Sequence, residues 1–496
     1  MSILDEPIKR VLRLKNYING EWVEPESNKV RDVVNPATMK VIGKTPLSSA
    51  KDVDTAVEAA KAAFPEWRKT TPLTRARYFF RLKALLEEHF EEISRVGVME
   101  HGKTIDESRG ETRRGIENVE VGAGIPSLMM GYNLEDIARG IDEYLIRQPL
   151  GVFACIAPFN FPFMVPLWFM PYAVATGNTY IVKPSPWVPI SQHMLFELID
   201  EAGFPPGVIN LVQGDVEAVN AIIKHPDVQG ISFVGSTHVG RDIIYKEGCA
   251  RGKRVQAQCS AKNFLVVMPD AVVDRTIASL MTSFYGNTGQ RCLSGANLIV
   301  VGDDAFSRRF VKKTAEAAAN IRMGYGLDER VQMGPLQAEG RKKRVLGYIE
   351  RGVEEGAKLL LDGRRFTIVG DYPEACFLGP SIFQDVTEDM VIAQDEIFGP
   401  VMNVLSVQDL DEAIALVNNS AFGNAASIFT SSGSASRRFQ YEIQCGNVGI
   451  NIGIVAPMAF FPFSGMKASF YGDLHGQGKD AINFFTEQKV VIVRWF

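Results

Sequence analysis

The apolar and polar positions of the first 150 residues predict hairpins followed by helices. Residues 16–47 alternate short polar and β-rich pieces, which is typical of hairpins. Ser49 is followed three residues later by Asp52, which resembles a capping box, and an apolar face at helical spacing continues over residues 53–64. Helical patterns extend to about residue 130, and residues 144–149 have the pattern of a strand that ends at a turn.

From residue 151 onward, short apolar runs alternate with helical stretches. The runs occupy residues 151–156, 179–182, 208–212 and 230–234, and two more follow at 264–267 and 296–301. This β-α-β rhythm predicts a parallel, doubly wound sheet followed by a second α/β unit. Residues 489–493 read as a terminal strand with an apolar face. Such strands often add to the sheet of another subunit, so we expect oligomerisation.

Composition excludes several function classes. The 496 residues favour two to four domains, and the net charge of −5 leaves no basic field for nucleic acid. The six cysteines form no C-x-x-C pair and have no metal-ligand spacing with the six histidines. The pattern therefore indicates a reducing compartment, and it argues against a disulfide scaffold or a metal site.

One segment requires a test for membrane insertion. Residues 153–182 are apolar over most of their length, but four prolines and two asparagines interrupt the run. We expect a buried strand, a loop and a helix there. The N-terminus carries acids where a signal peptide would need a basic stretch, so the expected location is the cytoplasm, without a membrane partner.

The first candidate for catalysis is Cys292, which follows Arg291 on the glycine-flanked segment 286–292. A thiolate is a strong nucleophile, and a neighbouring cation is one way to lower the pKa of a thiol into the working range. A buried structural cysteine is the favoured alternative for this segment taken alone, because free cysteines are among the most buried residues.

Two further segments suggest an anion site. Residues 233–240 follow a strand and open a helix, so backbone N–H groups near Gly235 and Ser236 can bind a pyrophosphate. The run lacks the G-x-G-x-x-G fingerprint, and a plain glycine turn is an equal alternative. Lys183 stands at the end of a strand, and nucleotides commonly bind at this carboxyl edge of a parallel sheet. The alternative is that Lys183 is an ordinary surface lysine.

An amide donor stands in the proline-fixed loop 157–162. Asn160 in this apolar setting suits an oxyanion hole, and the alternative is an asparagine that caps its own loop.

Five segments together resemble the aldehyde dehydrogenase superfamily over nearly the whole chain. They are the Pro-Phe-Asn-Phe-Pro loop, the Lys-Pro-Ser strand end, the Phe-Val-Gly-Ser turn, Gly-Gln-Arg-Cys and the Glu-Ile-Phe-Gly-Pro run at 396–400, in the order of the family. The resemblance implies that Cys292 is the nucleophile and that Asn160, with the Cys292 N–H, forms the oxyanion hole. It also implies a set of cofactor-binding residues: Phe159, Lys183, Ser185, Gly235, Ser236, Glu396 and Phe398.

The implied fold is α/β, with a Rossmann-like cofactor-binding domain, an α/β catalytic domain and a β oligomerisation arm. The resemblance places the cofactor domain at 1–130 and 149–257 and the catalytic domain at 258–450. The arm would comprise 131–148 and 470–496, and residues 451–469 would return the chain to the cofactor domain.

One catalytic position departs from the pattern of hydrolytic family members. These carry a glutamate that activates water, whereas the matching position here is Gln258, whose amide cannot accept a proton from water. Either another group assists deacylation or another nucleophile accepts the acyl group. The branch that transfers the acyl group to coenzyme A, which includes methylmalonate-semialdehyde dehydrogenase, also lacks this glutamate. The chain is similar to that branch in the runs 261–263, 268–271, 449–452 and 469–473.

In that branch two arginines bind the carboxylate of the substrate, and Arg114 and Arg291 match them. The planar guanidinium suits a bidentate carboxylate contact. The alternatives are a solvated helix residue for Arg114 and a structural cation for Arg291. Pro186 stands where members that prefer NAD carry a ribose-binding glutamate, so NADP stays open beside NAD. Cys259 lies near the expected nicotinamide and departs from the related runs.

The resemblance thus implies an NAD(P)-dependent oxidation of a small, carboxylated semialdehyde of the malonate or methylmalonate type through a thioacyl Cys292, with transfer to coenzyme A and decarboxylation. A homodimer or homotetramer is expected. The enzymatic alternative is a hydrolytic aldehyde dehydrogenase that produces a free acid. A non-catalytic relative is a different class, and the presence of both Cys292 and Asn160 disfavours it.

Overall fold

The computed structural model describes residues 4–496 and contains two large open sheets. The eight-stranded sheet has the order β24-β12-β11-β8-β9-β10-β2-β3, and its five strands from β12 to β10 are parallel. The predicted parallel, doubly wound sheet is therefore confirmed. The bounds of its strands are β2 (Asn16–Ile18), β3 (Glu21–Val23), β8 (Val152–Ile156), β9 (Thr179–Lys183), β10 (Ile209–Leu211), β11 (Val228–Val234), β12 (Arg254–Gln258) and β24 (Phe470–Tyr471).

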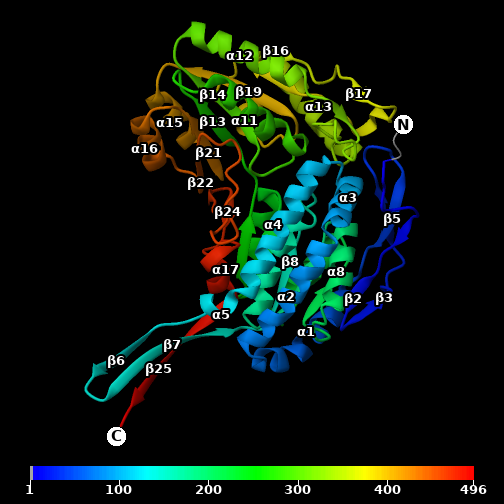
Figure 1. Cartoon of the computed structure of the whole chain (residues 1–496), viewed down its shortest axis with the longest axis vertical. Helices are drawn as coiled ribbons and strands as arrows, with labels where there is room; N and C mark the ends of the chain where they lie inside the picture. Colours follow the sequence, from blue (N-terminus) through cyan, green and yellow to red (C-terminus); the bar gives the residue numbers. More distant parts are fainter. Residues whose placement is uncertain (1–3) are drawn as a thin grey trace.

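The second sheet has seven strands in the order β16-β18-β19-β14-β13-β21-β22 and occupies the upper part of Figure 1. All neighbours in it pair in parallel except β16 and β18. Its strands are β13 (Asn263–Val267), β14 (Gly295–Val301), β16 (Lys358–Leu361), β18 (Ser381–Gln384), β19 (Val401–Val407), β21 (Ala425–Phe429) and β22 (Asn447–Ile450). This is the second α/β unit that the apolar runs predicted.

The N-terminal region forms the expected hairpins and helices. β2 pairs with β3, and β4 (Val30–Val34) pairs with β5 (Val41–Pro46), both antiparallel. The capping box between Ser49 and Asp52 is present and begins α1 (Ala50–Lys69). Three helices follow, α2 (Pro72–Glu88), α3 (Phe90–His101) and α4 (Ile105–Ala123). α4 packs against the apolar segment after β8, and this contact places it beside the functional site.

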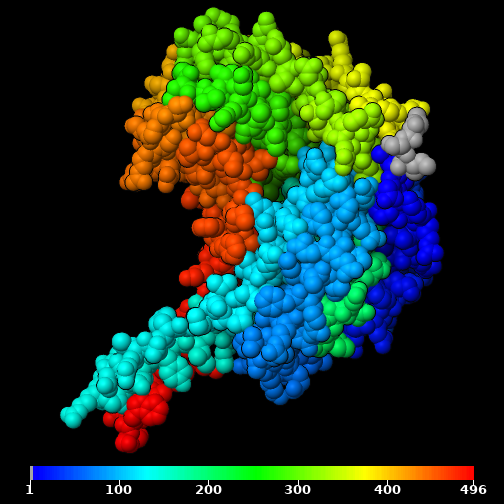
Figure 2. Space-filling view, viewed as in Figure 1, coloured from blue at the N-terminus to red at the C-terminus, as the bar shows by residue number. Residues whose placement is uncertain are grey.

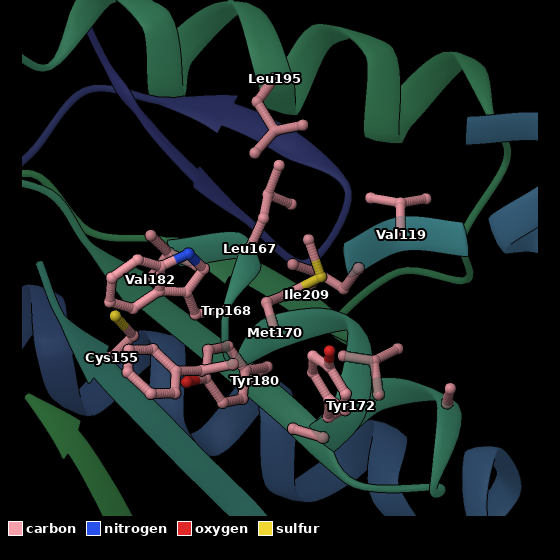
Figure 3. Packing of buried hydrophobic residues seen from close by; sticks show 14 of the residues in the cluster. Val119, Cys155, Leu167, Trp168, Met170, Tyr172, Tyr180, Val182, Leu195 and Ile209 are labelled. Carbon is pink, nitrogen blue, oxygen red and sulfur yellow. The ribbon is translucent and has the colours of Figure 1, made fainter. Parts of the chain in front are cut away.

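The apolar segment 153–182 is buried as a strand, a loop and two short helices. β8 leads into α6 (Met164–Leu167) and α7 (Met170–Ala175), and the chain returns as β9. Figure 3 shows the cluster in which Cys155, Trp168 and Tyr180 lie close together between these elements. No helix between residues 4 and 496 is long and apolar enough to cross a lipid bilayer.

A three-stranded arm projects from the body of the molecule (Figures 1 and 2). β7 (Ile141–Pro149) lies between β6 (Asn133–Ala138) and the terminal β25 (Thr486–Arg494), in an antiparallel sheet. Residues 470–485 differ from the expected arm. β24 pairs with β12 of the eight-stranded sheet, and α17 (Gly478–Phe485) packs against α7.

Candidate functional site

The site lies where the strand order of the eight-stranded sheet reverses. From β8 the chain continues to β9 and β10 on one side of the sheet, then crosses to β11 and β12 on the other. The loops that follow β8 and β11 diverge at such a point and leave a crevice at the carboxyl edge of the sheet. The residues after β8 include Phe159 and Asn160, and those after β11 include Gly235 and Ser236. A Cβ at Gly235 would lie 2.4 Å from the ring of Phe233, so this turn requires glycine.

A cavity of about 390 Å³ occupies this crevice. Six of the seven expected cofactor-binding residues line it: Phe159, Ser185, Gly235, Ser236, Glu396 and Phe398. Asn160, Cys259 and Cys292 lie on the same walls. The cavity therefore brings together residues from segments that are up to 239 positions apart, the separation from Phe159 to Phe398.

Lys183 is the seventh expected residue, and it does not line the cavity. Its Nζ donates to the carbonyl oxygens of Pro184, at 2.7 Å, and Gly214, at 3.1 Å. Burial lowers the pKa of Lys183 to about 8, and the nearby Asp215 opposes that shift. The residue is 3% exposed, which rules out the surface-lysine alternative.

Two arginines on α13 (Glu339–Glu354) also line this cavity, although nothing in the sequence pattern indicated them. The guanidinium carbon of Arg341 lies 3.3 Å from the centre of the Phe159 ring, and Nη2 of Arg344 donates to the carbonyl of Glu396 at 3.1 Å. Burial lowers the pKa of Arg341 to about 10. The run Arg341–Arg344 is entirely basic, a pattern that resembles a solvated helix face.

A second cavity, of about 380 Å³, lies on the other side of Cys292. Arg114 and Arg291 line it, and Phe161, Trp168 and Phe463 supply apolar walls. Cys292 contributes to both cavities. The thiol is thus placed between the cavity at the carboxyl edge of the sheet and a cavity that contains two cations.

The turn before Cys292 has an unusual backbone. α11 (Val273–Tyr285) ends, and Asn287 and Thr288 follow with φ angles of +54° and +55°. The left-handed region is costly for residues with side chains, so surrounding contacts must hold this turn. Gly289 has φ +70°, and a Cβ there would lie 2.2 Å from the carbonyl oxygen of Gly399. The turn before Cys292 therefore packs directly against the segment that follows Glu396.

The thiol of Cys292 has a raised pKa, although Arg291 acts in the expected direction and lowers it. Burial raises the pKa of Cys292 to about 12, and the charge of Glu396 adds to the shift. The backbone N–H groups of Cys292 and Leu293 and the charge of Arg291 oppose it, but these effects are smaller. In this state the thiol is protonated at neutral pH.

Asn160 is held through its backbone. Its carbonyl oxygen accepts hydrogen bonds from Nζ of Lys103 at 2.8 Å and from Nδ2 of Asn287 at 3.2 Å. Both contacts are to the backbone, and no hydrogen bond from the side-chain amide to its own loop is present among residues 4–496, so Asn160 does not cap that loop. The amide is available to a ligand in the cavity that it shares with Cys292.

The two arginines are each paired with a carboxylate of the protein. Nη2 of Arg291 lies 3.2 Å from Oε1 of Glu107, and Nη1 of Arg114 lies 3.0 Å from Oε2 of Glu117. Neither arginine is therefore a bare cation facing the cavity.

Comparison with known proteins decides the family. The model of the aldehyde dehydrogenase family matches residues 22–491. The chain belongs to the aldehyde dehydrogenase family. Malonate-semialdehyde dehydrogenase 2 of Geobacillus kaustophilus is 48% identical over 485 residues, which cover 98% of this chain and 99% of that protein.

Solved aldehyde dehydrogenase structures share the fold. The methylmalonate-semialdehyde dehydrogenase of Oceanimonas doudoroffii superposes with a TM-score of 0.95 at 41% identity, over 98% of this chain and 99% of that one. An aldehyde dehydrogenase of Bacillus cereus in complex with NAD+ has a TM-score of 0.92 at 33% identity, over 97% and 96% of the two chains. The predicted family and fold are confirmed.

Gln258 distinguishes this aldehyde dehydrogenase from the hydrolytic pattern described above. It ends β12 in the interior, where Nε2 donates to the carbonyl of Phe463 at 2.8 Å. Oε1 is buried without a partner among residues 4–496, and Gln258 lines neither cavity. This position therefore supplies no proton acceptor to either space.

A buried ion pair supports the Asn160 loop, and nothing in the sequence pattern indicated it. Lys103 and Glu111 contact each other in the interior, and their side chains are 0% and 2% exposed. Oε1 of Glu111 accepts hydrogen bonds from the backbone N–H groups of Phe163, at 2.9 Å, and Met164, at 3.2 Å. The pair therefore fixes both ends of the segment 160–164.

Proposed function

We propose that this aldehyde dehydrogenase oxidises a small carboxylated semialdehyde, of the malonate or methylmalonate type, and transfers the acyl group to coenzyme A. The observation that carries the proposal is the position of Cys292. It lies between a cavity that contains Asn160 and Glu396 and a cavity that contains two arginines. The names of the similar proteins agree with this substrate class.

The reaction begins at the thiol. The Cys292 thiol first releases its proton to water, and the resulting thiolate attacks the aldehyde carbon. The oxyanion that forms would be bound by the side-chain amide of Asn160 and the backbone N–H of Cys292. Bound NAD supplies the acceptor for the hydride that leaves this carbon. The carbon remains attached to Cys292 as a thioester.

The lining of the first cavity supports the proposed cofactor. Gly235 and Ser236 line it at a turn that would hold the pyrophosphate, and Arg341 and Arg344 bring positive charge to the same space. Glu396 would accept hydrogen bonds from the hydroxyls of the nicotinamide ribose. Pro186 is buried and can neither bind a ribose hydroxyl nor repel a 2′-phosphate, so NADP is proposed as an alternative cofactor.

Arg114 and Arg291 would bind the substrate carboxylate in the second cavity. A guanidinium fork matches the two oxygens of a carboxylate, and this contact would orient the aldehyde towards Cys292.

Coenzyme A is the proposed acceptor because Gln258 cannot activate water. The coenzyme A thiol attacks the thioester carbon and gives up its proton, the C–S bond to Cys292 breaks, and the Cys292 sulfur takes a proton as it is released. The bond between the α-carbon and the carboxylate of a malonate-type acyl group breaks to give CO2, and the α-carbon takes a proton from water. Product analysis with malonate semialdehyde tests this, and Cys292→Ser is the inactive control. We expect acetyl-coenzyme A and CO2, with slow turnover when coenzyme A is omitted. Free acid formed at full rate without coenzyme A would instead support the hydrolytic alternative.

The arm is the proposed contact with a second copy of the chain, in a homodimer or homotetramer. Apolar side chains on it are exposed, including Leu134, Ile137, Val490 and Ile492. Sedimentation of the full chain and of a Val490→Lys, Ile492→Lys variant tests this, and a shift of the variant towards the monomer mass is expected. A wild-type chain that sediments as a monomer would contradict the proposal.

A further inference from the structure

The positive charge of Arg291 is paired with a carboxylate of the protein itself. Its guanidinium contacts Glu107, and both side chains are largely buried on the wall of the second cavity. The Nε atom of Arg291 is buried without a partner among residues 4–496. A carboxylated ligand that approaches Arg291 therefore meets a cation that is already paired.

Glu107 also organises the catalytic turn. Its Oε1 accepts a hydrogen bond from the backbone N–H of Asn287, which has the left-handed φ, and its Oε2 accepts from the N–H of Thr104 at 2.9 Å. The second contact completes the capping box that begins α4. One carboxylate thus joins the start of α4, the strained turn before Cys292 and the side chain of Arg291.

The walls of the second cavity carry no excess of positive charge. Four carboxylates line it, from Asp106, Glu107, Glu111 and Glu117, against the two guanidinium groups. Glu111 is neutralised by Lys103, and Glu117 pairs with Arg114. Binding of a carboxylate at Arg291 must therefore compete with, or share, the contact to Glu107.

We propose that Glu107 is a specificity-determining and positioning residue, which restrains the affinity of Arg291 for carboxylated aldehydes while it holds the turn before Cys292. The inference rests on the proposed function, because it assigns the Arg291 side of the cavity to the substrate carboxylate. Removing the charge of Glu107 strengthens the field that Arg291 presents to an anion. Removing its hydrogen bond to Asn287 loosens the turn.

Two variants separate these roles. Glu107→Gln removes the charge and keeps an oxygen that can accept from Asn287. We expect the ratio of KM for malonate semialdehyde to KM for propanal to fall about three- to tenfold. The inhibition constant of propionate, a non-reacting carboxylate, should fall by a similar factor. Glu107→Asp keeps the negative charge but shortens the side chain, so the carboxylate lies further from the backbone of Asn287. We therefore expect kcat to fall for both aldehydes, while the ratio of the two KM values stays within about twofold of the wild-type ratio.

The control is Glu91→Gln, which removes a carboxylate that pairs with Arg109 away from the cavity and should leave both KM values unchanged. In an Arg291→Leu background the effect of Glu107→Gln on the KM ratio should disappear. An equal rise of both KM values in Glu107→Gln, or the same ratio change in both backgrounds, would overturn the proposal. A KM ratio that shifts as strongly in Glu107→Asp as in Glu107→Gln would contradict the charge argument. A wild-type enzyme that oxidises malonate semialdehyde no better than propanal contradicts the proposed function instead.

Discussion

The Nζ atom of Lys103 lies 2.8 Å from the carbonyl oxygen of Asn160. The same ammonium group pairs with Glu111, so a fully buried cation fixes the peptide whose side chain is the proposed oxyanion donor. A buried charge is costly unless it is paired. Beyond their contact with each other, Lys103 donates to a backbone carbonyl of the loop, and Glu111 accepts from backbone N–H groups at its end.

Replacing Lys103 with methionine should therefore affect both folding and turnover. Removing one partner of a buried pair costs about 3–5 kcal/mol of unfolding free energy. The loss of the contact to Asn160 should also lower kcat by about tenfold, because the amide is no longer aligned. Urea unfolding and steady-state kinetics measure the two effects. Lys51→Met, in an exposed pair with Glu26, is the matched control, and equal losses in both variants would refute the role of burial.

The raised pKa of Cys292 predicts the pH dependence of its alkylation. With a pKa of about 12, the thiolate fraction of the enzyme without cofactor rises about tenfold per pH unit throughout the stable range. The rate of carbamidomethylation of the peptide that contains Cys292, followed by mass spectrometry, should rise from pH 6 to pH 10 without a plateau. Cys249, which is exposed, serves as the internal reference thiol. A plateau for Cys292 below pH 8 would contradict the prediction.

Arg114→Leu should discriminate between substrates. Loss of a charged hydrogen bond to a carboxylate costs about 1.5–3 kcal/mol, so KM for malonate semialdehyde should rise by roughly ten- to hundredfold while KM for propanal changes little. Arg113→Leu is the control, because Arg113 pairs with Glu87 and does not line the cavity. Equal changes for both aldehydes would remove Arg114 from the binding site.

Gln258→Glu should fail to create a hydrolytic enzyme. The new carboxylate would face the carbonyl of Phe463 in the interior, so burial would raise its pKa in the folded state. An acid whose pKa is raised on folding loses stability as the pH rises from its unfolded value through its folded value. The melting temperature of the variant should therefore lie further below that of the wild type at pH 8 than at pH 5. Gln256→Glu is the comparison, because Gln256 is also buried and lies on the same strand two residues before Gln258. Rapid release of free acid by Gln258→Glu without coenzyme A would contradict the argument.

The sequence was sufficient to predict most of the fold. Buried parallel strands are continuous apolar runs, and each of the runs from 151–156 to 296–301 became a strand of a parallel sheet. The family resemblance assigned residues 470–485 to the arm together with the terminal strand. Only the pairing of β24 with β12 and the packing of α17 place them with the body of the molecule.

The site was predictable where a residue lies within a recognisable motif. The cavity walls include Asn160, Glu396 and Cys292 from three such motifs. The burial of individual site residues could not be predicted from the sequence. The raised pKa of Cys292 follows from burial, and the pairing of Lys103 with Glu111 in the interior looks, in the sequence, like ordinary charges on a helix and its preceding loop.

The contact of Gly289 with Gly399 has a mechanical consequence. The carbonyl group of Gly399 occupies the space that a Cβ of residue 289 would need, so the two segments contact each other through their backbones, without a side chain from residue 289 between them. Glu396 stands three residues before that contact, and Cys292 three residues after it. We therefore expect a displacement of the loop that carries Glu396 to reach the turn of Cys292 through contact between backbones, which would couple binding in the first cavity to the position of the sulfur.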